Sequence, residues 1–250
     1  MTGASAASEV RVGAFGRTIT AYATAREQWQ ALVPIDLEQA TGRYDLIATA
    51  RVGARTARAT RTIVVEPKVF STRTLKVAAS FVNPPAKARA RIAREALVVR
   101  SAYATSAPQR LWNTPFVAPV NEPANSRFGQ RSIFNGQPRS RHSGTDFLSP
   151  AGTPVKAPNA GRVVVAQDLF MSGNTVIIDH GLNLFSMMAH LQAIDVRDGD
   201  MVMAGQIVGR VGATGRVTGP HLHWAMRASG ARVDPLSAVA LLGDQISTAR

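Results

Sequence analysis

The chain of 250 residues contains no cysteine, which excludes a disulfide framework, a thiolate metal site and a cysteine nucleophile. It has no apolar run of about 18 residues, the length that a membrane-spanning helix needs. Histidine is absent from the first 141 residues, and only 4 of the 29 basic residues are lysine. The first residues have neither the basic stretch nor the apolar stretch of a secretory signal, so we expect no leader within this sequence.

All five histidines lie in one segment, at His142, His180, His190, His221 and His223. On an extended strand, residues two apart point to the same face, about 6.6 Å from each other. His221 and His223 would therefore present neighbouring imidazoles, which either both bind one ion or divide binding and chemistry between them. A catalytic zinc needs about three nitrogen or oxygen ligands and a position left for water. The segment predicts such a zinc site.

His142 and Asp146 are four residues apart, a spacing that would place both on one face of a helix. Gly144 lies between them and prolines follow at positions 150 and 154, which argues against a helix. We predict a bent loop or the start of a strand, in which Gly144 lets the backbone turn so that both side chains reach the metal.

A series of motifs runs through the second half of the chain. They are Arg127-Phe-Gly-Gln-Arg, His142-Ser-Gly-Thr-Asp146, Gly152-Thr-Pro-Val, Gly173-Asn-Thr-Val-Ile-Ile-Asp-His180-Gly, Ala189-His190-Leu and Thr214-Gly-Arg-Val-Thr-Gly-Pro-His221-Leu-His223-Trp. Their identity and order resemble the lysostaphin-type (LytM) zinc metallopeptidases. Met188 departs from that pattern, since many relatives carry an aromatic residue there, which concerns packing and substrate preference.

The resemblance implies one zinc ion per chain, bound by His142, Asp146 and His223. It implies that His190 and His221 are the catalytic pair, one as general base and one as donor to the oxyanion, in an order that the sequence leaves open. The implied activity is hydrolysis of peptide cross-links in bacterial peptidoglycan, with D,D-endopeptidase specificity. A periplasmic or secreted location follows from that substrate.

His180 is expected to have a structural role. It ends an apolar run before Gly181, where a histidine caps a turn more often than it touches a metal. We therefore place it outside the site.

The composition predicts a mainly β protein with two domains. Short alternating runs within residues 1–105 predict an N-terminal immunoglobulin-like β-sandwich that folds independently and, having no histidine, contributes nothing to the metal site. Residues 85–100 predict one helix, with Ile92, Ala96 and Val99 against the sandwich.

Residues 106–126 predict a proline-rich linker, with Trp112 and Phe116 available to dock it on one of the domains. Residues 127–250 predict the metallopeptidase domain, a twisted antiparallel β-sheet with the metal in a groove on one face. Its expected strands are residues 162–167, 175–179, 184–190, 206–212 and 221–227.

The net charge of +13 lies mostly in the first part, where residues 1–105 hold 16 basic and 7 acidic residues. The arginines are dispersed, which favours general attraction to anionic wall polymers or lipid head groups over specific binding of nucleic acid. A solvated basic face without a dedicated partner is an equal alternative.

Two other functions compete with the peptidase. One is a non-catalytic wall-binding regulator of a peptidoglycan amidase, against which the complete ligand set argues. The other is a protein that binds nucleic acid or a membrane surface, which would leave the histidine cluster unexplained. The sequence leaves the oligomeric state open, together with the choice between targeting, partner binding and shielding for the first domain.

Overall fold

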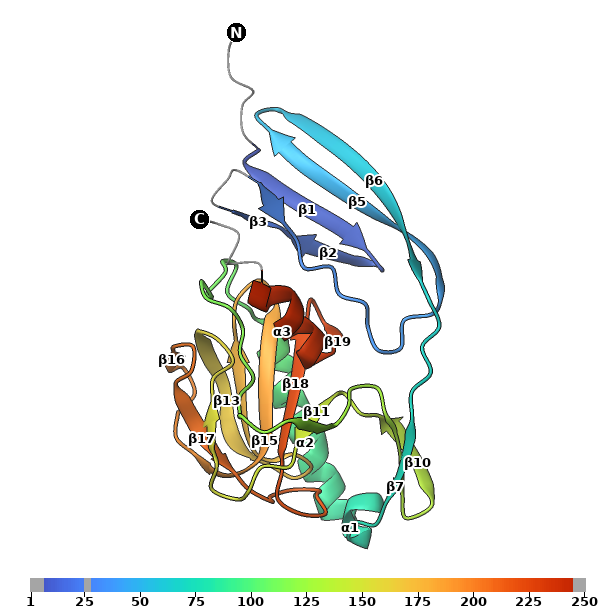
Figure 1. Cartoon of the computed structure of the whole chain (residues 1–250), viewed down its shortest axis with the longest axis vertical. Coiled ribbons are helices and arrows are strands. Elements are labelled where there is room, and N and C mark those ends of the chain that lie inside the picture. Colours follow the sequence, from blue (N-terminus) through green and yellow to red (C-terminus); the bar gives the residue numbers. More distant parts are fainter. Residues whose placement is uncertain (1–6, 25–27, 245–250) are drawn as a thin grey trace.

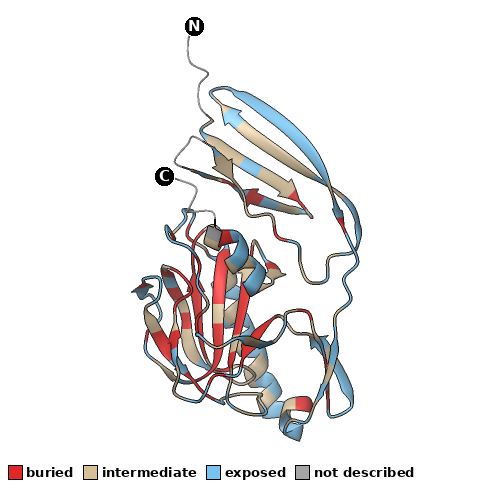
Figure 2. Ribbon diagram, in the orientation of Figure 1, coloured by how far each residue is buried: buried red, intermediate tan, exposed pale blue. Residues whose placement is uncertain are grey.

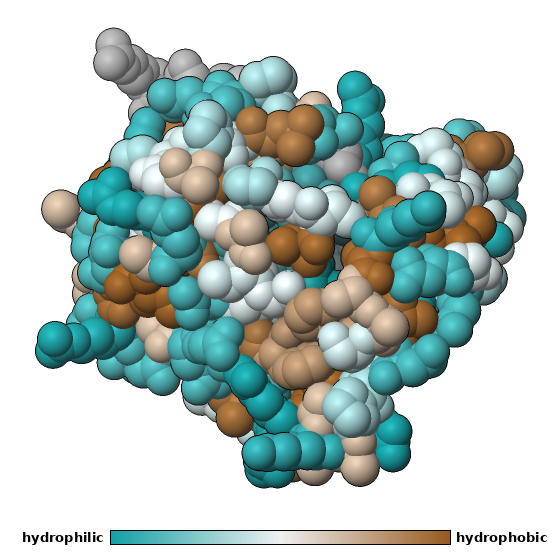
Figure 3. Space-filling model, turned by 90° about the horizontal axis from the view of Figure 1, so that it is seen from below, coloured by the Kyte–Doolittle hydropathy of each residue, from teal (hydrophilic) through white to brown (hydrophobic). Residues whose placement is uncertain are grey.

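The computed structural model describes residues 7–24 and 28–244, and it confirms a mainly β architecture (Figure 1). Within these residues its strands form a first sheet of four strands, a large sheet of ten and a small sheet of three, together with a two-stranded ribbon. No helix in the described residues is long and apolar enough to cross a membrane. On the face seen in Figure 3, hydrophobic residues gather in several separate patches among hydrophilic ones.

The first sheet contains four antiparallel strands in the order β2-β1-β5-β6. Its strands are β1 (Glu9–Ala14), β2 (Arg17–Thr20), β5 (Gly42–Val52) and β6 (Arg55–Val65). A separate ribbon pairs β3 (Tyr22–Ala23) with β4 (Trp29–Gln30). Nearly every residue of β6 is exposed (Figure 2). The immunoglobulin-like topology stays a prediction.

The large sheet is antiparallel throughout and runs in the order β16-β13-β14-β15-β18-β11-β8, with β12, β17 and β19 paired beside this path. Its strands are β8 (Ala124–Ser126), β11 (Gly144–Phe147), β12 (Pro154–Lys156), β13 (Gly161–Leu169), β14 (Gly173–Asp179), β15 (Leu184–Ile194), β16 (Met201–Val202), β17 (Ile207–Val211), β18 (Leu222–Ala228) and β19 (Ala231–Val233). All five predicted strands are confirmed as β13, β14, β15, β17 and β18.

The hydrophobic core lies on the large sheet, whose central strands are buried on both faces (Figure 2). Met188 and Trp224 are fully buried at neighbouring positions of β15 and β18. Strands that bury both faces have few polar positions, which makes each polar group among them a candidate for function.

The small sheet joins the two parts of the chain. It contains β7 (Thr72–Leu75), β9 (Arg131–Phe134) and β10 (Gln137–Arg141) in the order β10-β9-β7. The pairing of β7 with β9 is parallel and places Arg73 opposite Ser132. A strand from the first 105 residues is therefore fixed beside the segment that leads to His142.

Two helices follow β7, the short α1 (Ala79–Val82) and the long α2 (Ala86–Ala104). Helix α2 confirms the predicted helix, but its packing partner differs from the predicted one. It lies on β13 of the large sheet, and Tyr103 meets Phe185 edge-on at 5.2 Å between ring centroids. Arg91 also pairs with Asp168 on β13. The expected packing of the stripe against the sandwich is wrong, because Val99, with Ala102 and Tyr103, packs against the large sheet, and Ala96 is exposed.

The proline-rich segment 106–126 docks on the large sheet. Trp112 and Phe116 are 3% and 2% exposed and belong to its core. The Asp179 carboxylate accepts hydrogen bonds from Ser106 Oγ at 2.6 Å and from the Ala107 amide at 2.8 Å. The docking is confirmed, and the domain boundaries themselves stay a prediction.

Helix α3 (Pro235–Asp244) was not expected from the sequence. The Asp234 carboxylate caps its first turn, accepting from the Leu236 amide at 3.0 Å and from Ser237 Oγ at 3.2 Å. Aspartate at the N-cap followed by proline is a helix-start signal that could have predicted it.

Candidate metal centre

Three neighbouring strands position Asp146, His223 and His190. Strands β11 and β18 pair so that Asp146 lies directly opposite His223, and Ala189 of β15 lies opposite His223 on the other side. His190, which follows Ala189, is thereby brought beside the same point. The register of the large sheet therefore gathers residues that are up to 77 positions apart along the chain.

The three predicted ligands converge on one point. His142 Nε2 and His223 Nδ1 each lie 2.9 Å from Asp146 Oδ1, and the two nitrogens are 3.0 Å apart. Two imidazoles and a carboxylate are a donor set that suits catalytic zinc. Ligands at about 2.0–2.1 Å from a tetrahedral ion are roughly 3.3–3.4 Å apart, so a few tenths of an ångström of outward movement would fit the triangle to zinc.

Further contacts orient these ligands from outside. His142 Nδ1 lies 3.3 Å from the carbonyl oxygen of Arg127, an acceptor that keeps the proton on Nδ1 and leaves Nε2 for the ion. Arg73 Nη1 donates to Asp146 Oδ2 at 3.1 Å, and Arg73 Nε donates to Ser132 Oγ at 3.2 Å. Asp146 therefore has one oxygen on the two imidazoles and the other on a guanidinium.

The contact from Arg73 corrects the expectation that the first 105 residues contribute nothing to the metal site. Sequence reasoning missed it because the search considered histidine and acidic ligands only. Alternating runs predicted strands within residues 1–105, but no local signal gave the partner of Arg73, which is 59 residues away.

The site strongly favours an ionised Asp146. Burial opposes ionisation, yet hydrogen bonds from His142 and His223 outweigh it and hold the pKa of the carboxyl well below its usual range. Burial lowers the pKa of His223, against the effect of Asp146. A carboxylate with neutral imidazoles is the protonation state that a cation requires of its ligands.

Gly144 has a different role from the expected one. It is the first residue of β11, which confirms the predicted strand start, and its φ is not in the left-handed region. A Cβ at this position would lie 2.4 Å from the Trp224 carbonyl oxygen and 2.8 Å from the ring of His223. Glycine is needed here for the close approach of the His223 imidazole rather than for a turn.

His190 and His221 form a second pair beside the ligands. Their ring centroids are 4.8 Å apart, and the ring of His190 is 5.9 Å from that of His223. His190 has a φ of 66°, a left-handed conformation that is strained for a residue with a side chain. Its amide donates to Ser172 O at 2.8 Å, which fixes that conformation.

Both rings of this pair are held through Nδ1. His190 Nδ1 donates to Thr214 O at 2.9 Å, and His221 Nδ1 donates to Gly219 O at 2.9 Å. Thr214 is fixed in turn, because its Oγ1 donates to Leu191 O at 2.7 Å. Burial and the two neighbouring histidines lower the pKa of His190 to about 3, so its Nε2 is a free acceptor near neutral pH.

His180 lies in the core of the large sheet, away from this cluster. Its Nδ1 donates to Ala160 O at 2.8 Å, Nε2 lies 2.9 Å from Ser186 Oγ, and burial lowers its pKa to about 4. The structural role predicted for it is consistent with these contacts.

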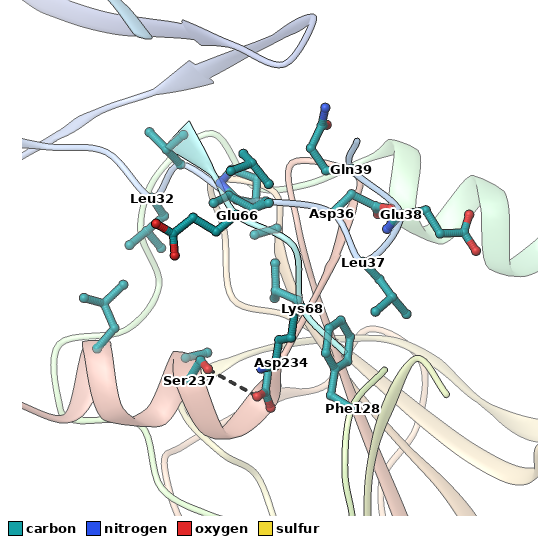
Figure 4. Close-up of a pocket in the computed structure, with 18 of the residues that line it drawn as sticks. Leu32, Asp36, Leu37, Glu38, Gln39, Glu66, Lys68, Phe128, Asp234 and Ser237 are labelled. Carbon is teal, nitrogen blue, oxygen red and sulfur yellow. Dashed lines mark hydrogen bonds between the residues drawn. The ribbon is translucent and has the colours of Figure 1, made fainter. Parts of the chain in front are cut away.

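A cavity of about 890 Å³ lies apart from these histidines (Figure 4). It is lined mainly by residues 32–39, residues 64–68 and helix α3, and neither the three predicted ligands nor His190 and His221 line it. Leu32 and Leu37 line it from the first of these segments, and Phe128 lines it from the segment before β9 (Figure 4). Its walls join the first part of the chain to the large sheet and supply no metal ligand.

Comparisons with known proteins agree with the geometry. Residues 140–235 match the model of peptidase family M23. A crystal structure of a putative peptidase M23 from Pseudomonas aeruginosa superposes with a TM-score of 0.71 and 32% identity, covering 92% of this chain and 87% of that one. The chain belongs to peptidase family M23.

The M23 relatives with curated descriptions are longer proteins. The peptidoglycan DD-endopeptidase ShyA of Vibrio cholerae is 43% identical over 97 residues, which are 39% of this chain and 23% of ShyA. The DD-carboxypeptidase/endopeptidase Mpg of Neisseria meningitidis is 41% identical over 96 residues, 38% of this chain and 22% of Mpg. The match therefore spans less than a quarter of each relative.

Proposed function

We propose that this M23 protein is a zinc-dependent endopeptidase that hydrolyses peptide cross-links of bacterial peptidoglycan, as a D,D-endopeptidase, outside the cytoplasm. The observation that carries the proposal is the convergence of His142, Asp146 and His223 within 4.8 Å, with His190 and His221 beside them. The printed activities of ShyA and Mpg support the substrate class.

The donor set fits one zinc ion held by His142 Nε2, Asp146 Oδ1 and His223 Nδ1. When bound there, zinc acts as a Lewis acid that lowers the pKa of a water molecule and polarises the scissile carbonyl. The Arg73 guanidinium binds the second oxygen of Asp146, so the carboxylate would hold the ion through Oδ1.

His190 is the general base in this mechanism. Its lowered pKa keeps the ring neutral, and the hydrogen bond from Nδ1 to Thr214 O leaves Nε2 to accept the proton of the attacking water. The fixed backbone around His190 limits the positions that the ring can take. The proton then passes to the amine that leaves when the C–N bond breaks.

His221 is the donor to the oxyanion. Its Nδ1 donates to Gly219 O, so Nε2 can donate to the developing charge on the carbonyl oxygen only when the ring carries a proton on both nitrogens. The sequence left the two roles interchangeable, and the environment of His190 supports this order. A purely regulatory wall-binding protein would need neither the ligand triangle nor this second pair.

Purified sacculi test the proposal. The zinc-loaded protein should release un-cross-linked muropeptides from cross-linked dimers, which mass spectrometry identifies by the addition of one water per bond cut. The same preparation after dialysis against a chelator is the control, and added zinc should restore release. Absence of cleavage by fully loaded protein, on sacculi and on soluble dimers, would contradict the proposal.

A further inference from the structure

Two arginines that the proposed mechanism does not use lie on segments leading to site histidines. Arg139 is on β10, three residues before His142. Arg216 is in the loop that starts at Thr214, whose carbonyl holds His190, and ends at His221. Short connections to the histidines limit how far either arginine can lie from the metal.

The small sheet gives a second connection between Arg216 and the metal. The Arg216 guanidinium carbon lies 4.8 Å from the centroid of the Phe134 ring on β9. Ser132, two residues before Phe134 and on the same buried face of β9, accepts the hydrogen bond from Arg73, which also contacts Asp146. Positions two apart on a strand are about 6.6 Å from each other, so Arg216 lies on the face that carries the ligand contact.

The two guanidiniums lie close enough to repel each other. Burial and the neighbouring Arg139 lower the pKa of Arg216. Among the described residues, no carboxylate forms an ion pair with either arginine. Arg139 donates to Val82 O and Gln137 Oε1, both at 2.8 Å, while its Nε is buried with no hydrogen-bond partner.

Like charges that are brought together and partly desolvated destabilise a fold unless an anion joins them. The ring of Phe134 supports the face of Arg216 but takes none of its N–H groups. The open donors of two arginines fit a carboxylate, which accepts paired N–H bonds in a planar geometry.

We propose that Arg139 and Arg216 form a subsite that binds a carboxylate of the peptide substrate next to the scissile bond. This subsite rests on the proposed function and deepens it, because it assigns the enzyme a preference for acidic over amidated cross-link peptides. We assign the specificity to Arg216, because it lies in the loop between Thr214 and Gly219, whose carbonyl oxygens hold His190 and His221. Arg139 adds charge from β10, the strand paired with β9 and its Phe134.

The test compares two substrates that differ only in charge. A soluble cross-linked muropeptide dimer with free carboxylates and the same dimer converted to carboxamides are given to the zinc-loaded full chain. We expect kcat/KM to be about 10- to 100-fold higher for the acid, the usual effect of charge-assisted hydrogen bonds. Arg216→Gln should abolish the preference, because it lowers kcat/KM for the acid far more than for the amide.

Arg91→Gln is the matched control, because Arg91 is an arginine paired with Asp168 on the outer side of β13. It should retain the full preference for the acid. Arg139→Gln should reduce the preference in part. Equal cleavage of both substrates by the unmodified protein, or an equal loss on both in Arg216→Gln, would overturn the subsite while leaving the peptidase intact.

A binding measurement separates this inference from the proposed function. The acid and amide dimers are titrated into zinc-loaded His190→Ala protein and followed by calorimetry. Tighter binding of the acid, lost in the additional Arg216→Gln variant, supports the subsite even if no dimer is ever hydrolysed. Equal affinity for the two dimers would overturn it.

Discussion

The two parts of the chain contain long antiparallel hairpins of opposite character. In the first sheet, β6 pairs along its whole length with β5, yet only Val65 is buried on it. In the large sheet, all but one of the residues of β14 are buried, and its partner β15 is nearly as enclosed. The same backbone pairing therefore serves a solvated surface in one part and a core in the other.

This difference shows where stability and chemistry are located. The large sheet buries enough apolar surface to hold strained His190 and the charged Asp146 in fixed positions. The first part is joined to it by three ion pairs between arginine and aspartate, Arg73 with Asp146, Arg91 with Asp168 and Arg232 with Asp36. The variants below test this division, from the largest expected effect to the smallest.

The variants His190→Ala and His221→Ala test whether the large sheet carries the chemistry, because each removes one of the two proposed catalytic imidazoles. Each should keep one zinc and lose hydrolysis by a factor on the order of 100 or more, the usual contribution of a general base or an oxyanion donor. Elemental analysis and initial rates on a muropeptide dimer measure both properties. Loss of zinc in either variant, or full activity, would contradict the assigned roles.

Matched valines compare the two hairpins directly. Val176 on β14 is fully buried, whereas Val64 on β6 is 57% exposed. Val176→Ala should lower the free energy of unfolding by about 2 kcal/mol, from lost burial and a cavity, and Val64→Ala by less than about 0.5 kcal/mol. Urea denaturation gives both values. Equal losses would mean that the first sheet has a core of its own.

The Arg73 contact tests whether the first part supports the metal. Arg73→Gln should weaken zinc affinity about 10-fold, because Asp146 loses the donor that orients it. Competition with a chromophoric chelator measures the dissociation constant, with Arg91→Gln as control. Unchanged or tighter zinc binding would show that the guanidinium does not orient the ligand.

Much of this site could be predicted because the motifs and the strands that carry them are local. The residues His142, Asp146 and His223 were identifiable from the resemblance, and alternation predicted the strands beside them. Arg73 was not predictable, because its place depends on a parallel pairing with a strand 59 residues away. The prediction that α2 packs on the first sheet was wrong for the same reason, because the periodicity of a helix does not indicate which sheet it contacts.

The ion pair between Arg232 and Asp36 has a smaller, pH-dependent effect on the free energy of unfolding. Burial opposes ionisation of Asp36, but hydrogen bonds from Arg232 prevail and lower its pKa to about 2 from 3.8. Its stabilisation is therefore present above about pH 4 and is lost as the pH falls toward 2. The stability advantage of the natural chain over Asp36→Asn should shrink by about 1 kcal/mol between roughly pH 5.5 and pH 3. A constant difference in urea denaturation would contradict this.

The central claim is that His142, Asp146 and His223 hold one zinc ion, and His223→Ala tests it most directly. Elemental analysis after dialysis against buffered zinc should find one zinc per natural chain and nearly none per His223→Ala chain, because the variant loses one of three ligands. His180→Ala removes a histidine outside the cluster and should keep its zinc, provided circular dichroism shows that it is folded. A stoichiometric zinc content in His223→Ala would contradict the assignment.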